Sequence, residues 1–447
     1  MTTRAQDDPS PTVPATAKQG EETRQRREDR WGFVEPAIWT ERMIAALETG
    51  VKGGKWFSLM DKVCAERTLR VAWERVKRNR GAAGIDRQSV DAFDAHAARY
   101  LSELAADLRT GQYRSQPVKR VWIEKPGSQD RRPLGIPTVK DRVVQTALKV
   151  VLEPIFEAGF AEQSYGFRPG RGCKDALRRV ETLLQSGAVW VVDVDIQHYF
   201  DSIPHDALLE AVQVRVADGR VLDLLQGMLR QGVMEGLERW EPEAGTPQGA
   251  VISPLLANIY LNPLDHTMEA RGGEMVRYAD DFVILCRSQA EAEATLAAIQ
   301  AWMEPHGLTL HPEKTRIVDT RERGGFDFLG YHFERGKHWP KPASTKHFRR
   351  AIKAKTRRTS GESLETIIAA INPIIRGWYG YYKHGHRTTY APLDSYVRMR
   401  LRSILRHRRG GAGRGRGADH RRWPNAFFDA HGLFTMTAAR RAAGYSR

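Results

Sequence analysis

Cysteine is scarce in this sequence: the 447 residues include three, Cys64, Cys173 and Cys286. They lie far apart and form no CxxC pair, so the sequence offers neither a disulfide framework nor a cysteine-rich zinc site. Long apolar runs are missing too. No stretch reaches the roughly 18 apolar residues of a membrane span, and the N-terminus lacks the apolar segment of a secretion signal. We therefore expect a cytoplasmic protein of the bacterial, intracellular type, with no membrane partner.

Acidic residues are few in the last quarter of the chain. Residues 341–447 carry 24 Lys and Arg against 5 Asp and Glu, a net charge of +19, whereas the whole chain has a net charge of +16. The body before residue 341 is therefore close to neutral. Lys and Arg neutralise phosphates, and the aromatic side chains interleaved with them can stack on bases. This asymmetry predicts a nucleic-acid-binding module, with a solubilising segment as the alternative.

Apolar spacing predicts a mostly helical N-terminal part. Residues 1–55 are expected to form a tail, largely disordered to about residue 30, because Pro, Ser, Thr and mixed charge dominate its beginning. From Trp56 onward apolar residues recur at helical spacing, and a second helical run covers 93–108. A third helix is expected over 141–156, with Asp141 as its N-cap.

Alternating or continuous apolar runs predict several strands. One strand, 118–123, runs toward the Pro126-Gly127 turn, and another, 188–196, is apolar enough to be buried. Residues 275–286 form two apolar runs split by two aspartates, which indicates a hairpin. Residues 326–333 are expected to form one strand with a glycine bend. Basic helices follow, and the glycine-rich segment 409–417 is expected to be too flexible to pack.

Four carboxylates fall at the ends of these strands. Asp280 and Asp281 lie at the expected hairpin tip, where two adjacent acids in apolar surroundings would repel each other unless a divalent cation neutralises them. Asp193 and Asp195 share one face of a strand because side chains alternate with period two. An Asp-Asp pair alone is usually turn chemistry. The combination favours two Mg²⁺ ions and phosphoryl transfer.

The sequence resembles the reverse transcriptases encoded by group II introns. The tetrad YADD at 278–281, followed by FVIL, is similar to the YxDD box of reverse transcriptases. Other blocks of that family occur in the family's order from about residue 60 to the C-terminus. These blocks are MDKVCAERTLRVAWERVKRNRGAAGID, RRPLGIPTVKDRVVQTALKVVLEPIFE, SYGFRPGRGCKDAL, VVDVDIQHYFDSIPH, GTPQGAVISPLLANIYLNPLD, LHPEKTRI and FDFLGYHF.

The resemblance implies an α+β right-hand polymerase followed by an α-helical thumb. Its fingers would cover residues 56–187, and its palm, with a small antiparallel sheet, residues 188–338. The basic helices of 339–447 would form the thumb, also called domain X or the maturase domain. Many relatives continue into an HNH endonuclease with paired cysteines, which this sequence lacks, so we expect a member without an endonuclease.

The resemblance also assigns roles to the carboxylates and to the residues around an incoming nucleotide. Two Mg²⁺ ions would be held by Asp195, the carbonyl of Ile196, Asp280 and Asp281, with Asp193 in a structural or supporting role. The expected nucleotide-binding residues are Lys125, Arg132 or its neighbour Arg131, Ile196, Phe200, Gln248 and Lys314. The bulk of Phe200 would exclude the ribose 2′-hydroxyl, and Lys314 would lie near the leaving pyrophosphate.

Four further basic residues are candidates for contacts with nucleic acid: Arg168, Arg171, Arg376 and Lys383. For the first two, in SYGFRPGRG, the alternative interpretation is a packed loop. The last two lie beside Trp378, Tyr379, Tyr381 and Tyr382, about half of which helical spacing assigns to a core.

The predicted activity is that of an RNA-directed DNA polymerase, a nucleotidyltransferase of a group II intron retroelement. Its partners would be intron RNA as template, a DNA primer or target and deoxynucleoside triphosphates, and its maturase domain would bind intron RNA to assist splicing. The alternatives are an RNA-binding splicing maturase without polymerase activity and a retron or defence-type reverse transcriptase. An RNA-directed RNA polymerase is disfavoured by Phe200. The oligomeric state stays open, with a dimer as one option.

Overall fold

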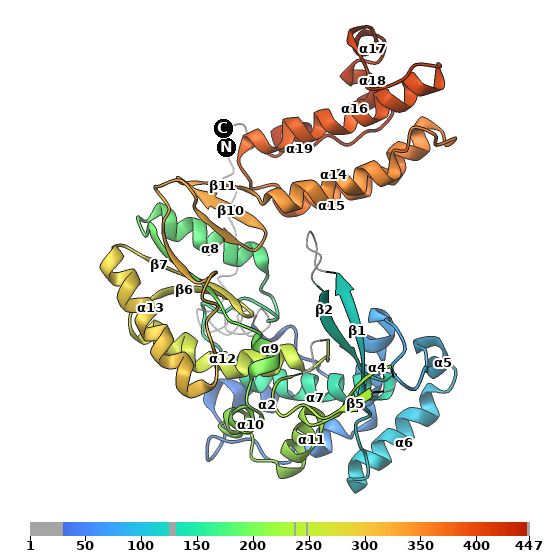
Figure 1. Cartoon of the computed structure of the whole chain (residues 1–447). Coiled ribbons are helices and arrows are strands. Elements are labelled where there is room, and N and C mark those ends of the chain that lie inside the picture. The colour runs from blue at the N-terminus through green and yellow to red at the C-terminus, as the bar shows by residue number, and fades with distance from the viewer. Residues whose placement is uncertain (1–29, 125–130, 237, 247–248, 445–447) are drawn as a thin grey trace, which may run out of the picture.

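The computed structural model describes residues 30–124, 131–236, 238–246 and 249–444. The predicted disorder before residue 30 and two predicted nucleotide-binding residues, Lys125 and Gln248, lie outside these ranges. No helix in the described ranges is long and apolar enough to cross a membrane. Figure 1 shows the C-terminal helices (342–442), which we call the thumb, above the strands β1 (Val118–Glu124) and β2 (Arg131–Ile136).

Helices dominate the first part of the chain. They are α2 (Glu41–Thr49), α3 (Met60–Val63), α4 (Glu66–Asn79), α5 (Val90–Asp94), α6 (Ala97–Thr110) and α7 (Val139–Glu157). Trp31 and Trp39 are buried in the same core as these helices, so the later part of the expected tail is folded. Helix α7 begins after Thr138, whose hydroxyl accepts a hydrogen bond from the amide of Asp141. The predicted cap, Asp141, is therefore wrong: it lies inside the first turn and accepts a bond from the Tyr113 hydroxyl.

A four-stranded sheet, which we call the fingers sheet, has the order β2-β1-β4-β5. Its strands are β1 (Val118–Glu124), β2 (Arg131–Ile136), β4 (Val233–Glu235) and β5 (Glu238–Trp240). β1 pairs antiparallel with β2 and parallel with β4. β4 and β5, expected in the palm range, thus belong to one sheet with β1 and β2 of the expected fingers, through the pairing of β4 with β1.

A second sheet, the palm sheet, has the order β6-β7-β3-β8. Its strands are β3 (Trp190–Asp195), β6 (Glu274–Tyr278), β7 (Asp281–Cys286) and β8 (Arg316–Asp319). Side chains alternate between two faces. On the first face, Val192, Val194 and Ile284 pack in the large core that also contains the N-terminal helices. On the second, opposite face, Val191 and Leu285 pack in a separate, smaller core. The β6–β7 hairpin is the one predicted from the sequence.

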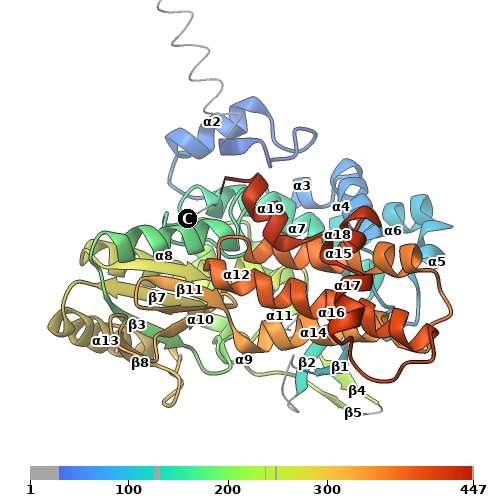
Figure 2. The same ribbon diagram turned by 90° about the horizontal axis from the view of Figure 1, so that it is seen from above.

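Helices cover both faces of the palm sheet (Figure 2). The helices of this part of the chain are α8 (Cys173–Gln185), α9 (Tyr199–Ser202), α10 (His205–Gln213), α11 (Gly219–Leu229), α12 (Ser253–Ala270), α13 (Gln289–Met303) and the 3-10 turn η1 (Glu304–His306), of which α8, α12 and α13 pack on the sheet. α13 packs on β3 and β7. α8, expected in the fingers range, packs on β6 and β7 on the opposite face.

The segment predicted as one bent strand over 326–333 forms two strands. A three-stranded sheet consists of β9 (Phe326–Phe328), β10 (Tyr331–Glu334) and β11 (Lys337–Pro340). β9 and β10 pair antiparallel around Leu329 and Gly330, which both have positive φ and so reverse the chain. Phe326 and Phe328 join the second-face core of the palm sheet.

The C-terminal helices form a separate core. They are α14 (Pro342–Lys355), α15 (Leu364–Tyr382), η2 (Arg387–Thr389), α16 (Tyr390–Arg408), α17 (Gly417–Arg422), α18 (Asn425–Ala430) and α19 (Met436–Ala442). The glycine-rich segment before α17 is not the unpacked linker expected. The Arg406 Nε donates to the Ala412 carbonyl at 2.9 Å, and a side chain at Gly415 would lie 3.2 Å from the Arg402 Cβ.

Candidate active site

The palm sheet brings together carboxylates that lie 86 positions apart in the sequence, Asp195 and Asp281. Asp195, the last residue of β3, pairs in register with Asp281, the first residue of β7. Residues paired across antiparallel strands place their side chains on the same face. The turn between β6 and β7 contains Ala279, whose φ of 61° is in the left-handed region, followed by Asp280. Three carboxylates are therefore positioned by one strand pair and one turn.

The electrostatics of this cluster favour a cation. Burial, together with repulsion from Asp193, Asp280 and Asp195, raises the pKa of Asp281 to about 7, against the opposing charge of Lys341. Burial also raises the pKa of Asp280, with a contribution from the charge of Asp195. Protonation or a bound cation would relieve this repulsion.

A lysine ammonium supplies one such cation. The Lys314 Nζ lies 2.7 Å from an Asp195 carboxylate oxygen, although 119 residues separate them. The segment that carries Lys314 is held against β3, because the amide of His311 donates to the Asp195 carbonyl at 2.8 Å. The structure thus brings together two residues that the sequence assigned to one site.

The donor atoms of this cluster fit Mg²⁺, which prefers carboxylate and carbonyl oxygens. Among the described residues, no three His, Cys, Asp or Glu side chains converge closely enough to hold a metal ion as they stand. Asp195 is instead engaged by the ammonium of Lys314. Ile196, whose carbonyl was the fourth expected ligand, follows β3 directly and has a buried side chain.

Asp193 has a partner of its own. Its carboxylate lies 3.4 Å from the Arg316 Nε. The two residues are paired in register between the antiparallel strands β3 and β8. Burial raises the pKa of Asp193 to about 6, and Arg316 opposes this shift. This pairing agrees with the supporting role expected for Asp193.

A buried arginine that the sequence analysis missed anchors the YADD turn. Arg277 is fully buried and forms two hydrogen bonds to the Asp265 carboxylate, at 2.7 and 2.5 Å. Its third nitrogen donates to the Asn258 side-chain oxygen and to the Ala279 carbonyl, both at 2.9 Å. Because the Ala279 carbonyl belongs to the turn itself, this network ties the YADD turn to helix α12. An Arg directly before YADD and the Leu264-Asp265 pair within α12 were the available signals.

The SYGF segment (164–167) also contacts the YADD turn and the residues that hold it. The Asn258 amide donates to the Gly166 carbonyl at 2.8 Å, and the amide of Tyr165 donates to the Arg277 carbonyl. A Cβ at Gly166 would lie 2.3 Å from the amide nitrogen of Ala279. Only glycine permits this approach of the two backbones.

Among the described nucleotide-binding candidates, Arg132 acts electrostatically on the YADD turn. Arg132 on β2 pairs with Ile123 of β1, and its charge holds down the pKa of Asp280. The neighbouring Arg131 is not among the main charges that change the pKa of Asp280. Because side chains alternate along a strand, Arg131 points to the opposite face from Arg132. This favours Arg132 over Arg131.

Phe200 lies on α9, five residues after Asp195. Its side chain is half-buried, with its ring centroid 5.5 Å from that of Tyr199. Its carbonyl accepts a bond from the Thr246 amide at 2.6 Å, and a Cβ at Gly249 would lie 2.6 Å from the Gly135 carbonyl of β2. Thr246 therefore contacts α9, and Gly249 lies against the fingers sheet.

Arg168 does not fit its expected role in nucleic-acid binding. Its side chain is 2% exposed, and its guanidinium is occupied by the Glu157 carboxylate and by the carbonyls of Ala161 and Ser164. A buried, fully bonded arginine cannot reach a phosphate, so the packed-loop interpretation describes Arg168. Arg171 is nearer the surface and pairs with the exposed Glu162.

The two thumb candidates are accessible to different degrees. Arg376 is exposed on α15 and stacks on the ring of Phe434 at 4.5 Å, whereas Lys383 is half-buried at the end of α15. Of the neighbouring aromatics, Tyr379 is buried in the thumb core, and the Tyr381 hydroxyl donates to the Leu329 carbonyl. The aromatic run thus mainly packs the thumb and joins it to the three-stranded sheet.

The described geometry agrees with comparisons to known proteins. Residues 123–333 match the family model "Reverse transcriptase (RNA-dependent DNA polymerase)". Residues 345–423 match "Group II intron, maturase-specific domain". The chain belongs to the group II intron reverse transcriptase/maturase family. These two domains imply binding of RNA and DNA.

Similar curated proteins come from bacteria and from fungi. The chain is 31% identical over 353 residues to the protein YkfC of Escherichia coli, covering 70% of this chain and 87% of YkfC. It is 38% identical over 197 residues to the group II intron-encoded protein LtrA of Lactococcus lactis, covering 44% of this chain and 32% of LtrA. The match thus spans about a third of LtrA. A putative COX1/OXI3 intron 1 protein of Saccharomyces cerevisiae is 26% identical, covering 71% of this chain and 44% of that protein.

Solved structures show weaker likeness. A Cas6-RT-Cas1–Cas2 complex gives a TM-score of 0.35 at 24% identity, covering 55% of this chain and 41% of that chain. Telomerase from Candida albicans in complex with telomeric RNA gives a TM-score of 0.39 at 12% identity, covering 71% of this chain and 64% of that one.

Proposed function

We propose that this chain is an RNA-directed DNA polymerase of a group II intron. The observation that carries the proposal is the register pairing of Asp195 with Asp281 beside the Asp280 turn, with Lys314 and Arg132 at the same cluster. In this proposal Asp195, the Ile196 carbonyl, Asp280 and Asp281 hold Mg²⁺, which would stabilise both the attacking and the leaving oxygens of nucleotidyl transfer. Such an enzyme works inside the cell, where its RNA template and deoxynucleoside triphosphates are found.

Each remaining residue has a separate task in this proposal. Arg132 and Lys125 bind the triphosphate from the fingers sheet, and Phe200 excludes the ribose 2′-hydroxyl. Lys314 passes from Asp195 to the pyrophosphate, where a positive charge stabilises the developing negative charge. Arg277 holds the turn that carries Asp280 without contacting the nucleotide.

Primer extension tests the polymerase assignment. The wild-type protein, an RNA template with an annealed DNA primer, Mg²⁺ and deoxynucleoside triphosphates should give extended primer, and Asp280→Asn should give none. Omitting Mg²⁺ should also stop extension. A wild-type protein that binds the template–primer but does not extend it would overturn the assignment.

We infer a second role in splicing, because residues 345–423 match the maturase-specific domain. The same match favours a group II intron protein over a retron or defence-type enzyme. In vitro splicing of the intron that flanks the gene should require the protein, and the Asp280→Asn variant should support it as well as wild type does. Splicing that fails only in this variant would contradict a role separate from polymerisation.

A further inference from the structure

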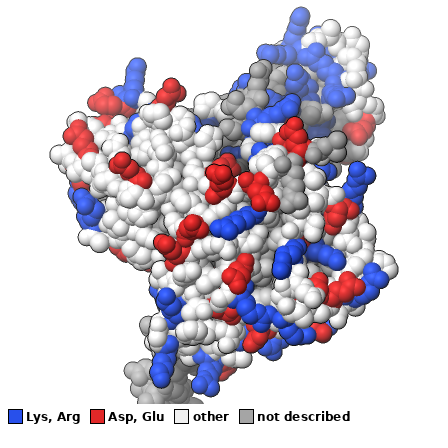
Figure 3. All heavy atoms as spheres, turned by 60° about the horizontal axis from the view of Figure 1, so that its bottom comes forward, with Lys and Arg blue, Asp and Glu red and all other residues white. Residues whose placement is uncertain are grey.

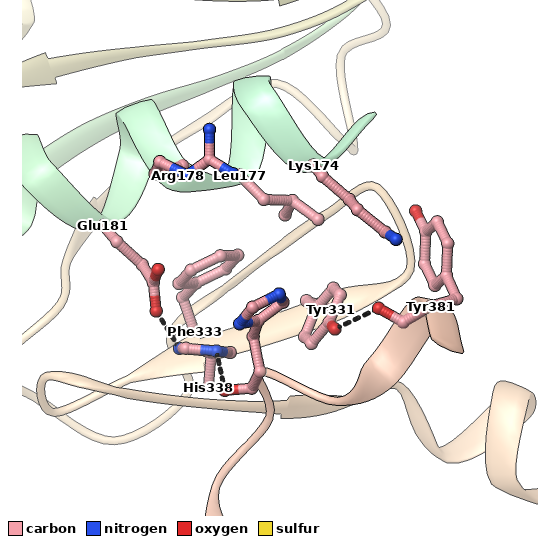
Figure 4. Close-up of a pocket in the computed structure, with 9 residues that line it drawn as sticks. Lys174, Leu177, Arg178, Glu181, Tyr331, Phe333, His338 and Tyr381 are labelled. Carbon is pink, nitrogen blue, oxygen red and sulfur yellow. Dashed lines mark hydrogen bonds and ion pairs between the residues drawn. The ribbon is translucent and has the colours of Figure 1, made fainter. Parts of the chain in front are cut away.

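A groove between α8 and the strands β10 and β11 lies outside the site described above. Its wide part has a volume of about 500 Å³, and a narrow slot of about 40 Å³ continues from it. Figure 4 shows the slot, with α8 on one side and the strands on the other. We call both parts together the α8–β11 groove. No described residue of the predicted catalytic or nucleotide-binding set lines it.

The floor of the α8–β11 groove is apolar, and its side chains pack against one another. Tyr331 and Phe333 are almost fully buried, and both rings lie 5.3 Å from the imidazole of His338. The His338 Nε2 donates to the His384 carbonyl at 2.7 Å, and its Nδ1 lies 3.2 Å from the Glu181 carboxylate (Figure 4). Glu181 is thus engaged by His338. It is the one acidic side chain among the described residues that line the groove.

The rim of the α8–β11 groove is cationic. Its basic residues come from α8, from β11, from the segment after α15 and from α19. They are Lys174, Arg178, Lys337, Arg387 and Arg440. Arg178 pairs with Asp175 at 3.1 Å. Within the described part of the chain, Lys174, Lys337 and Arg387 have no ion-pair partner, so their charge is not compensated by the protein.

The lowered pKa values of two histidines, His384 and His386, reflect this positive potential. Burial lowers the pKa of both, and the surrounding cations lower it further. For His384 these cations are Lys383, Lys174, Arg178 and His338. For His386 they are Lys337, Arg387, Arg440 and His338. An anion in the groove would stabilise protonated imidazoles, so binding it would take up protons.

We propose that the α8–β11 groove binds the phosphodiester backbone of a folded RNA, outside the template–primer duplex. The proposal rests on the proposed function, because the maturase role requires the chain to hold RNA by surfaces other than its polymerase site. Residues 384–387 belong to the segment that matches the maturase-specific domain, which favours RNA over DNA. Unpaired Lys and Arg side chains are the groups that contact phosphates without reading sequence.

Charge reversal in the groove tests the proposal on the full-length protein. The probe is a fluorescein-labelled RNA stem-loop of about 40 nucleotides, long enough to offer the several phosphate contacts that set a salt slope. Its binding is measured by anisotropy in the presence of saturating unlabelled template–primer, which occupies the polymerase site. Lys337→Glu/Arg387→Glu should weaken stem-loop binding about tenfold and reduce the salt slope by about two, since each lost phosphate contact removes about one. The matched control is Arg109→Glu/Arg271→Glu, two exposed arginines outside the groove with no ion pair among the described residues.

Further comparisons decide between the possible outcomes. Primer extension by the groove variant should stay within about twofold of wild type, which shows that it is folded and separates this proposal from the polymerase assignment. Equal loss of stem-loop binding in both double variants, or none in the groove variant, would overturn the proposal. A DNA stem-loop of the same sequence that competes as well as RNA would overturn the choice of RNA.

A pH series adds a readout specific to this groove. Stem-loop affinity of the wild type should rise as the pH falls from about 8 to about 5.5, the range in which histidines gain charge. In His384→Gln/His386→Gln the rise should be smaller. An identical pH dependence in the two proteins would contradict the electrostatic argument.

Discussion

The palm strands and the thumb helices of this chain differ in where their charged side chains lie. In the palm, acidic side chains are partly buried and are positioned by strand register, as in the pairing of Asp195 with Asp281. In the thumb, cations lie mainly on the outside of helices whose apolar faces form a separate core. Figure 3 shows both signs interspersed over the lower part, whereas Lys and Arg gather at the upper right, where Figure 1 places the thumb. A site for chemistry needs fixed positions, and a surface for a polyanion needs net charge.

The largest expected effect concerns the fixed positions in the palm. Asp195→Asn should lower the rate of primer extension by about a thousandfold, because a metal ligand that stabilises the transition state by several kcal/mol is lost. RNA affinity should change by less than about twofold. Single-turnover primer extension and filter binding measure the two quantities. Near-normal extension by the Asp195→Asn variant would remove Asp195 from the site.

The next largest effect concerns the buried Arg277–Asp265 pair, which holds the YADD turn in place. Asp265→Asn leaves the Arg277 guanidinium buried without its carboxylate, which should lower the free energy of unfolding by about 3 to 5 kcal/mol. The double variant Asp265→Leu/Arg277→Met should recover much of that stability, since apolar residues of similar volume can replace a buried ion pair. It should not recover primer extension, because the bond to the Ala279 carbonyl is missing.

Denaturant unfolding and primer extension on the same preparations separate the two contributions. If the double variant is both stable and fully active, Arg277 has only a structural role.

Two arginines of one loop provide a smaller, matched contrast. Arg168→Met should lower the free energy of unfolding by about 3 kcal/mol, because it leaves Glu157 without its buried partner. Arg171→Met should cost less than about 1 kcal/mol, since its partner Glu162 is mostly exposed. Denaturant unfolding measures both changes, and Arg168→Met should leave the salt dependence of RNA binding as in wild type. A loss of RNA affinity in stable Arg168→Met protein would restore the original expectation.

The smallest expected effect concerns sugar selection. Phe200→Ala should raise ribonucleotide incorporation relative to deoxynucleotide incorporation by about tenfold, or about 1.4 kcal/mol of discrimination, because the bulk beside the sugar is lost. Phe200→Tyr, which keeps the bulk, should behave as wild type. The measurement is kcat/KM for each nucleotide class. No gain in the alanine variant would contradict the gate assignment.

Local patterns predicted most elements of the two regions. The β6–β7 hairpin, the buried strand β3 and the basic helices α14 to α16 follow from periodicity and turn residues. The paired positions of Asp195 and Asp281 required the register between strands far apart in sequence, which the family resemblance supplied. The break between β9 and β10 was missed because a Leu-Gly turn interrupts an otherwise continuous apolar pattern.

Burial explains the remaining differences. Arg168 and Arg277 look alike in the sequence as charged residues near glycines or aspartates, yet both are buried and paired with carboxylates 11 and 12 positions earlier in the chain. No local signal distinguishes such an arginine from an exposed one in a chain with 70 Lys and Arg. The glycine-rich segment before α17 was expected to be unpacked, but its glycines allow the backbone to approach α16 closely.

The most direct test of the separation between palm and thumb is one preparation of Asp280→Asn measured twice. The account predicts that primer extension is lost while affinity for a folded RNA stays within about twofold of wild type, because the substitution lies in the palm and removes no phosphate contact. Loss of both activities in folded protein would contradict the separation, and retention of primer extension would contradict the catalytic site itself.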